Sequence, residues 1–189
     1  MFWETLDFTK KSNQTKTKMS GVKVSHVYFD NSYPDFPAPG YLFVGVDPGM
    51  NFGITLISER VIEVMWGKLS RVGEFMGRQS QNLAESLGYD YELEYYYDKD
   101  KIHVYVEGAA YRSQYGQVEL EQIRFGFVQG FSKFAHLDNI KYIPPSTARK
   151  KAFGSGKLSG KDLFVNINNN GADSIGVALA AVSDYVGLA

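Results

Sequence analysis

The chain has 189 residues, with 20 Lys and Arg, 21 Asp and Glu, three His and no Cys. This length suits one domain with an appendage, and 44% hydrophobic and 22% charged residues are typical of a globular protein. The absence of cysteine excludes disulfides, thiolate zinc sites and a cysteine nucleophile, and no apolar run is long enough to predict a membrane span. A net charge of −1 argues against a uniformly basic surface for nucleic acid, so the distribution of charge has to be considered.

Residues 1–40 are predicted to be an N-terminal extension of a domain that spans residues 41–189. The extension is rich in Thr, Ser, Asn and Lys and has three prolines between residues 34 and 39, which predicts an extended lead-in. No apolar segment follows Met1 and the first arginine is Arg60, so neither a secretory signal nor a transit peptide is expected. Its aromatic residues are expected to dock on the main domain, or alternatively on a partner: Phe2, Trp3, Phe8, Tyr28 and Phe29.

The rest of the chain alternates between strand and helix patterns. Apolar and β-branched runs predict five strands, at residues 41–46, 53–57, 61–66, 101–106 and 140–143. Apolar residues at helical spacing predict three helices, at residues 71–87, 114–136 and 171–186. Short turns join the first three strands, which indicates an antiparallel meander. The expected fold class is therefore α/β, with a mixed five-stranded sheet flanked by helices.

Three carboxylates stand at the ends of predicted elements. Asp47 closes the first strand of the domain, Glu107 closes the fourth, and Asp173 opens the last helix. In α/β sheets ligands gather outside the strand ends, so these side chains would meet if the first and fourth strands are neighbours. Hard oxygen ligands suit Mg²⁺ or Mn²⁺, which can activate water for phosphodiester hydrolysis. Each residue also has a plain structural alternative, as a turn residue, a solvated strand end or a helix cap.

Four segments resemble, in order and spacing, those of RuvC-type Holliday junction resolvases of the ribonuclease H-like superfamily. They are Val44–Gly49 with Gly53 after it, Val104–Glu107, Pro145–Lys157 and Gly171–Ala180. The resemblance covers roughly residues 41–181 and is closest to bacteriophage members. It implies a ribonuclease H-like fold, a homodimer, paired nicking of branched DNA with Mg²⁺ or Mn²⁺, and a place in the cytoplasm of a bacterial host cell.

The resemblance also implies roles for particular residues. Asp47, Glu107 and Asp173 would be catalytic metal ligands, and Lys150 or Lys151 would lie near the scissile phosphate. The family usually has a further acidic or histidine ligand three or four residues before the last Asp. This chain has Asn170 and Asn169 there, whose amide oxygens can bind a metal but add no negative charge.

The segment from Lys141 to Lys161 contains six cationic side chains and no acidic one, which is the local charge density that phosphate binding needs. It is interpreted as a basic loop, in which Gly154, Ser155 and Gly156 would let the backbone approach a phosphate; a solvated loop is the alternative. The resemblance matches Tyr111 to an aromatic residue at the junction. The expected DNA-binding residues are Tyr111, Arg112, Gln114, Arg149, Lys150, Lys151, Ser155, Lys157 and Lys161.

Several alternatives to a junction-cleaving enzyme stay open. The asparagines at positions 169 and 170 favour a non-catalytic protein that binds branched DNA, and a nuclease of the same fold could act on flaps or hybrids. An actin-like ATPase is disfavoured because the chain has one phosphate loop and no second one, so no small-molecule cofactor is expected. The phenylalanines of the predicted helix over 114–136 exceed one stripe, and part of that face is expected to contact a second subunit, with core packing as the alternative.

Overall fold

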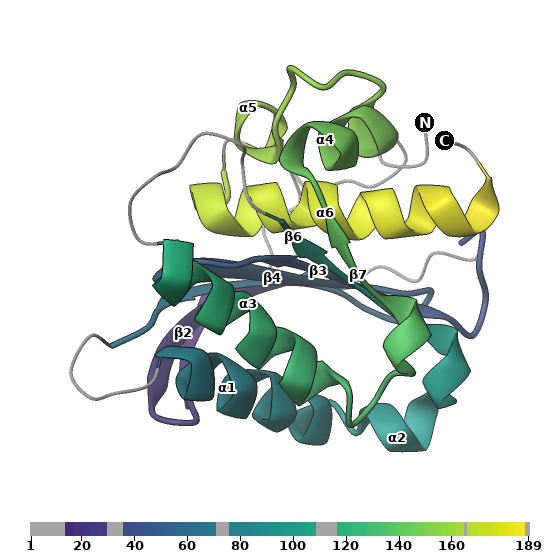
Figure 1. The fold of residues 1–189 in the computed structure, drawn as a ribbon. Coiled ribbons are helices and arrows are strands. Elements are labelled where there is room, and N and C mark those ends of the chain that lie inside the picture. Colours follow the sequence, from purple (N-terminus) through teal and green to yellow (C-terminus); the bar gives the residue numbers. More distant parts are fainter. Residues whose placement is uncertain (1–13, 30–35, 71–75, 109–116, 165, 188–189) are drawn as a thin grey trace.

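The structure, a computed structural model, describes residues 14–29, 36–70, 76–108, 117–164 and 166–187. A seven-stranded mixed sheet lies between two layers of helices (Figure 1). One face carries α4 (Pro145–Phe153), α5 (Gly160–Leu163) and α6 (Asn169–Val186), and the other carries α1 (Met76–Asp90), α2 (Leu93–Tyr96) and α3 (Gln117–Phe131). Each face has its own hydrophobic core. The expected α/β class is thereby confirmed.

The sheet has the strand order β1-β2-β5-β4-β3-β6-β7. β3, β4 and β5 form the predicted antiparallel meander, whereas β6 and β7 run parallel to β3. All five predicted strands are present. The strands are β1 (Gln14–Met19), β2 (Val22–Phe29), β3 (Leu42–Asp47), β4 (Asn51–Ile57), β5 (Ile62–Lys68), β6 (Ile102–Glu107) and β7 (Ile140–Ile143).

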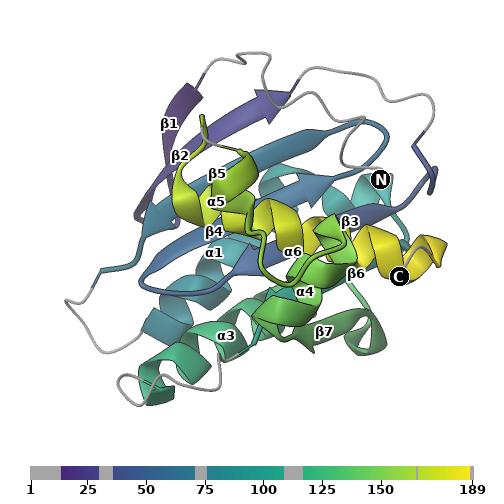
Figure 2. The same ribbon diagram turned by 90° about the horizontal axis from the view of Figure 1, so that it is seen from above.

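The N-terminal extension adds two strands, so the expected count of five was wrong. β1 and β2 form a hairpin, and β2 pairs antiparallel with β5 (Figure 2). Ser20 and Gly21 join the two strands with positive φ values of 47° and 82°, the left-handed geometry that suits a two-residue hairpin loop. Phe29 is buried on the main domain, as expected, while Tyr28 is 41% exposed. Phe2, Trp3 and Phe8 lie outside the described residues.

The basic segment was predicted as a loop, but much of it is helical. Pro145 begins α4. Proline lacks a backbone N–H, and at this position it costs nothing because the first N–H groups of a helix have no intrahelical acceptor. Gly154 ends this helix with a φ of 73°, so glycine is required there by the helix terminus. Ser159 and Asp162 then form a capping box that starts α5. Between the predicted helix at 71–87 and the predicted strand at 101–106, the chain also forms α2 and a short 3-10 helix (Lys99–Lys101).

The long helix α6 lies directly on the sheet and is buried along most of its length. Two glycines allow this approach: a Cβ on Gly45 would stand 2.2 Å from the backbone nitrogen of Ala178, and one on Gly53 would stand 1.9 Å from the carbonyl oxygen of Asn170. The hydroxyl groups of Thr55 and Ser174 are hydrogen-bonded at 2.7 Å in the buried interface. These contacts fix where the first turn of α6 meets β4.

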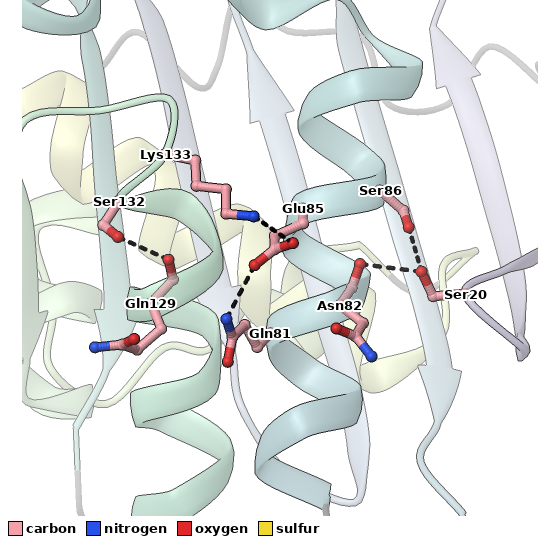
Figure 3. Close-up of polar contacts among 8 residues, drawn as sticks. All are labelled: Ser20, Gln81, Asn82, Glu85, Ser86, Gln129, Ser132 and Lys133. Carbon is pink, nitrogen blue, oxygen red and sulfur yellow. Dashed lines mark hydrogen bonds and ion pairs between the residues drawn. The ribbon is translucent and has the colours of Figure 1, made fainter.

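The opposite layer is built from α1 and α3 packed side by side. Lys133 donates to Glu85 across this pair at 2.7 Å, and Gln81 donates to the same carboxylate (Figure 3). Phe127 and Phe131 of α3 are fully buried against the sheet, whereas Phe125 is 58% exposed. The wide apolar face of α3 is therefore core on one side and open surface on the other. Within the described part of the chain, no helix is both long and apolar enough to cross a membrane.

Candidate metal and nucleic-acid site

Asp47 and Glu107 lie beside each other at the ends of two paired strands. β3 and β6 are parallel neighbours with Val46 opposite Val106, so the next residues of both strands are adjacent. Neighbouring strands are about 4.8 Å apart. Both carboxylates point to the α6 face, since Gly45 and Tyr105, two residues earlier on each strand, face that helix and its core. The predicted meeting of the two strand ends is confirmed.

Asp173 joins this pair from the first turns of α6. The carbonyl of Asn170 lies against Gly53, and Gly53 pairs with Asp47 in the sheet. The helix therefore begins over the strand ends. The charge of Asp173 acts on both Asp47 and Glu107. One of its oxygens also accepts a long hydrogen bond of 3.4 Å from the backbone N–H of Lys161 in α5.

The three carboxylates make this end of the sheet electrostatically unfavourable without a counter-charge. Burial raises the pKa of Asp47 well above its usual value, and the negative charges of Glu107 and Asp173 raise it further. Burial also raises the pKa of Glu107 to about 7, and Asp173 adds to this shift. A bound cation would favour the ionised forms that the site otherwise disfavours.

Two arginines partly offset this negative charge. Arg149 of α4 and Arg124 of α3 both act to lower the pKa values of Asp47 and Glu107. Arg124 is only 4% exposed, and its Nε donates to the backbone carbonyl of Glu107 at 3.0 Å. The sequence interpretation did not single out Arg124. The available signal was a cation next to the buried Ile123 in a helix rich in apolar residues.

No three His, Asp or Glu side chains among the described residues are gathered closely enough to form a ready metal-binding group. The carboxylates interact, but their side chains do not converge as a preformed set of ligands. Asp47, Glu107 and Asp173 nonetheless offer only hard oxygen donors, which is the chemistry that Mg²⁺ and Mn²⁺ prefer. Metal binding at this place therefore stays a prediction.

The asparagines predicted as further ligands lie in the first turn of α6. Asn168 caps the helix by accepting from the backbone N–H of Asn170 at 3.0 Å. Asn169 and Asn170 precede Asp173 by four and three residues, so they share a helix face with it. Asn169 is exposed and Asn170 half-buried.

The consecutive cations of α4 point to different places. Arg149 interacts with the carboxylates, but Lys151 bonds to Asp184 near the far end of α6, where Tyr105 donates to the same carboxylate at 2.6 Å. Asp184 lies eleven residues after Asp173, about 16 Å along the helix. Positions 149 and 151 are about 200° apart around α4, which explains the divergence. The structure therefore does not bring Lys151 to the carboxylates, whereas Lys150 between them is exposed.

The remaining predicted DNA-binding residues are spread over the same face. Lys157 and Lys161 are exposed, and the Ser155 hydroxyl accepts from the backbone N–H of Lys157 at 3.3 Å. The backbone N–H of Lys161 reaches Asp173, so this residue lies beside the carboxylates. Three predicted residues lie outside the described part of the chain: Tyr111, Arg112 and Gln114.

Comparison with solved structures identifies the architecture. The chain is similar to RuvC of Thermus thermophilus, with a TM-score of 0.57 and 15% identity over 77% of this chain and 96% of that one. A second match is T. thermophilus RuvC in complex with a Holliday junction substrate, with a TM-score of 0.56 and 12% identity over 78% and 96% of the two chains. No family model and no curated protein matches the sequence. At this identity the likeness concerns the fold: the chain has a RuvC-like, ribonuclease H-like fold.

Proposed function

We propose that the protein is a metal-dependent endonuclease that cleaves four-way and other branched DNA junctions by paired phosphodiester nicks. The observation that carries the proposal is the grouping of Asp47, Glu107 and Asp173 at one end of a RuvC-like sheet. Burial, and after it the repulsion from neighbouring carboxylates, raises the pKa values of Asp47 and Glu107, which is the cost of building a cation site from carboxylates. An ordinary set of solvated strand ends would carry no such shifts.

The three carboxylates would hold Mg²⁺ or Mn²⁺, with the amide oxygens of Asn169 and Asn170 as candidate additional donors. When bound, the metal would supply Lewis-acid stabilisation and an activated water for phosphodiester hydrolysis. Arg124 fixes the strand end through the carbonyl of Glu107. Arg149 stands close enough to affect both strand-end carboxylates and would bind a phosphate brought to them.

DNA would reach the carboxylates over the α4 and α5 surface. Arg149, Lys150, Lys157 and Lys161 offer positive charge there, while Lys151 is neutralised by Asp184. Electrostatic contact with the backbone suits a protein that selects the shape of a junction and not its sequence. A homodimer would supply the second active centre for paired nicks, and action on a phage or bacterial recombination intermediate would take place in the cytoplasm of the bacterial cell.

The test incubates the purified protein with a labelled four-way junction, a linear duplex of one arm and an RNA–DNA hybrid, with Mg²⁺, with Mn²⁺ or with chelator. We expect symmetric nicks in the junction only when metal is present. Asp47→Asn should abolish the nicks and keep the fold, because the two side chains have the same shape. The matched control is Asp138→Asn, an exposed residue at the opposite end of the sheet, which should cleave like wild type.

A non-catalytic junction-binding protein is the second candidate, favoured by the two asparagines in the first turn of α6. Tight binding to the junction without nicks under any metal would refute the enzyme and support this candidate. Asn169→Asp and, separately, Asn170→Asp would then show whether a missing carboxylate is the reason. Cleavage of flaps or hybrids in preference to the junction would instead correct the substrate.

A further inference from the structure

The hairpin of β1 and β2 carries a row of lysines that the carboxylate site does not use. Lys18 pairs with Lys23 across the hairpin, and the register of Val24 opposite Gly67 brings Lys23 beside Lys68 at the end of β5. Lys16 lies two residues before Lys18, on the same face of β1. All four lysines are exposed, and none of them pairs with a carboxylate of the described residues.

This lysine row lies on the same face and at the same end of the sheet as the candidate metal site. Lys23 alternates with Val22 and Val24, which are buried in the α1 and α3 core, so Lys23 points to the α6 side. One row of paired residues runs across the sheet from Asp47 through β4, β5 and β2 to Lys16. Four strand spacings of about 4.8 Å place Lys16 about 19 Å from Asp47.

The surface next to the row is hollowed at this end of the sheet, on the side of α1. An open groove of about 1120 Å³ lies between the hairpin turn, the start of β4, the end of β5 and the start of α1. Lys23 and Lys68 line it together with neutral polar residues such as Gln79 and with apolar residues such as Val22 and Leu69. No carboxylate is among the described residues that line it. Residues 14–29 as a whole contain three lysines and no acidic residue.

Side-chain contacts hold the backbone of the hairpin against α1 and β5. The Ser20 hydroxyl donates to the carbonyl of Asn82 in α1 at 3.0 Å and is also bonded to the Ser86 hydroxyl (Figure 3). His26 on β2 contacts the buried carboxylate of Glu63 at 2.5 Å. Lysines carried by a folded hairpin lose less backbone entropy on binding than lysines of the same number in a flexible tail.

We propose that Lys16, Lys18, Lys23 and Lys68 form a second DNA-binding surface, which holds the phosphate backbone of one duplex arm away from the point of cleavage. This inference rests on the proposed function for the identity of its substrate. Duplex DNA rises about 3.4 Å per base pair, so distances of about 10 to 19 Å from Asp47 correspond to phosphates roughly three to six base pairs along the arm.

The test compares Lys18→Gln with Lys23→Gln, made together, with a control pair that removes the same charge elsewhere. The control is Lys99→Gln with Lys101→Gln, two lysines paired with Glu94 and Asp98 at the opposite end of the sheet. Affinity for a four-way junction in chelator is measured over a range of salt concentrations, and phosphate-ethylation interference maps the contacted arm. Circular dichroism verifies that both variants fold.

We expect the hairpin pair to reduce the steepness of the salt dependence by about 2 and to weaken binding roughly tenfold or more at 0.1 M salt. Interference should disappear from phosphates three to six base pairs from the crossover, and the control pair should change neither. Equal effects of the two pairs, or no effect of the hairpin pair, would overturn this inference. The proposed function would still stand in that case if the wild-type protein cleaves the junction. If the hairpin pair loses binding but the wild-type protein does not cleave with any metal, the second DNA-binding surface is supported and the proposed endonuclease activity is refuted. A wild-type protein that does not bind DNA refutes both.

Discussion

Replacing Glu107 with Gln should stabilise the metal-free protein at alkaline pH. Burial raises the pKa of Glu107 from 4.5 to about 7 in the folded protein. A carboxyl with a raised folded-state pKa favours folding fully below its unfolded pKa, and this contribution is lost as pH rises through the folded pKa. Wild type therefore loses stability between about pH 4.5 and pH 7 from this group, while the neutral glutamine does not titrate.

The magnitude follows from the shift. At 1.36 kcal/mol for each pKa unit, a rise from 4.5 to about 7 corresponds to about 3 kcal/mol at pH 8. The true gain is reduced by the part of the carboxyl that contacts water, but it is increased because the negative charge of Glu107 also raises the pKa of Asp47. We therefore expect the free energy of unfolding of Glu107→Gln to exceed that of wild type by about 2 to 3 kcal/mol at pH 8.

The assay is urea denaturation in chelator at pH 4, 6 and 8. The two proteins should be about equally stable at pH 4 and diverge as pH rises. Glu94→Gln, which removes an exposed carboxylate 4.0 Å from Lys99, is the control and should differ from wild type by less than about 0.5 kcal/mol at every pH. If Glu107→Gln is no more stable than wild type at pH 8, or if both show the same pH dependence, the account of a strained carboxylate cluster is wrong.

Three further predictions concern the metal, the packing of α6 and the oligomeric state. Mg²⁺ at a hundredfold excess over its dissociation constant should stabilise wild type by about 2.7 kcal/mol at pH 8, and Asp47→Asn by much less. Thermal unfolding measures the effect. Equal shifts of the midpoint temperature in the two proteins would mean that the ion binds elsewhere. Gly45→Ala should lower the free energy of unfolding by about 1 to 3 kcal/mol or more, because the new Cβ would stand 2.2 Å from the α6 backbone. Gly156→Ala, whose Cβ would stand 3.4 Å from its nearest neighbour, should be nearly neutral. Urea titration measures both. Phe125→Asp should dissociate a homodimer that uses the exposed side of α3, whereas Tyr95→Asp, at another exposed aromatic residue, should not. Light scattering measures the mass of each variant. That interface is contradicted if neither variant lowers the mass or if both do.

Local patterns in the sequence were sufficient for five strands and the three long helices of residues 41–189, but not for α2, α4 and α5. Short apolar runs that end in turn residues identify buried strands, and the 3.6-residue period of α6 and α3 identifies helices, because burial on one face imposes the period. The same patterns place Asp47, Glu107 and Asp173 at element ends. The hairpin of β1 and β2 was not predicted. The exposed Lys and Thr of β1 show no apolar alternation, whereas Val22 and Val24 of β2 do alternate with polar residues, a signal that the prediction of an extended lead-in did not use.

Only the tertiary structure decided which of these ends meet and which cations face them. The pairing of β3 with β6 depends on a crossover that no local pattern encodes, and it makes Asp47 and Glu107 neighbours. Likewise, helical phase within α4 turns Arg149 toward the carboxylates and Lys151 toward Asp184, although the two are equivalent in a basic run. The sequence by itself determined the types of the charged groups and their order along the chain. How far the positive and negative charges offset each other at one site depends on the distances between them, and only long-range packing sets those distances.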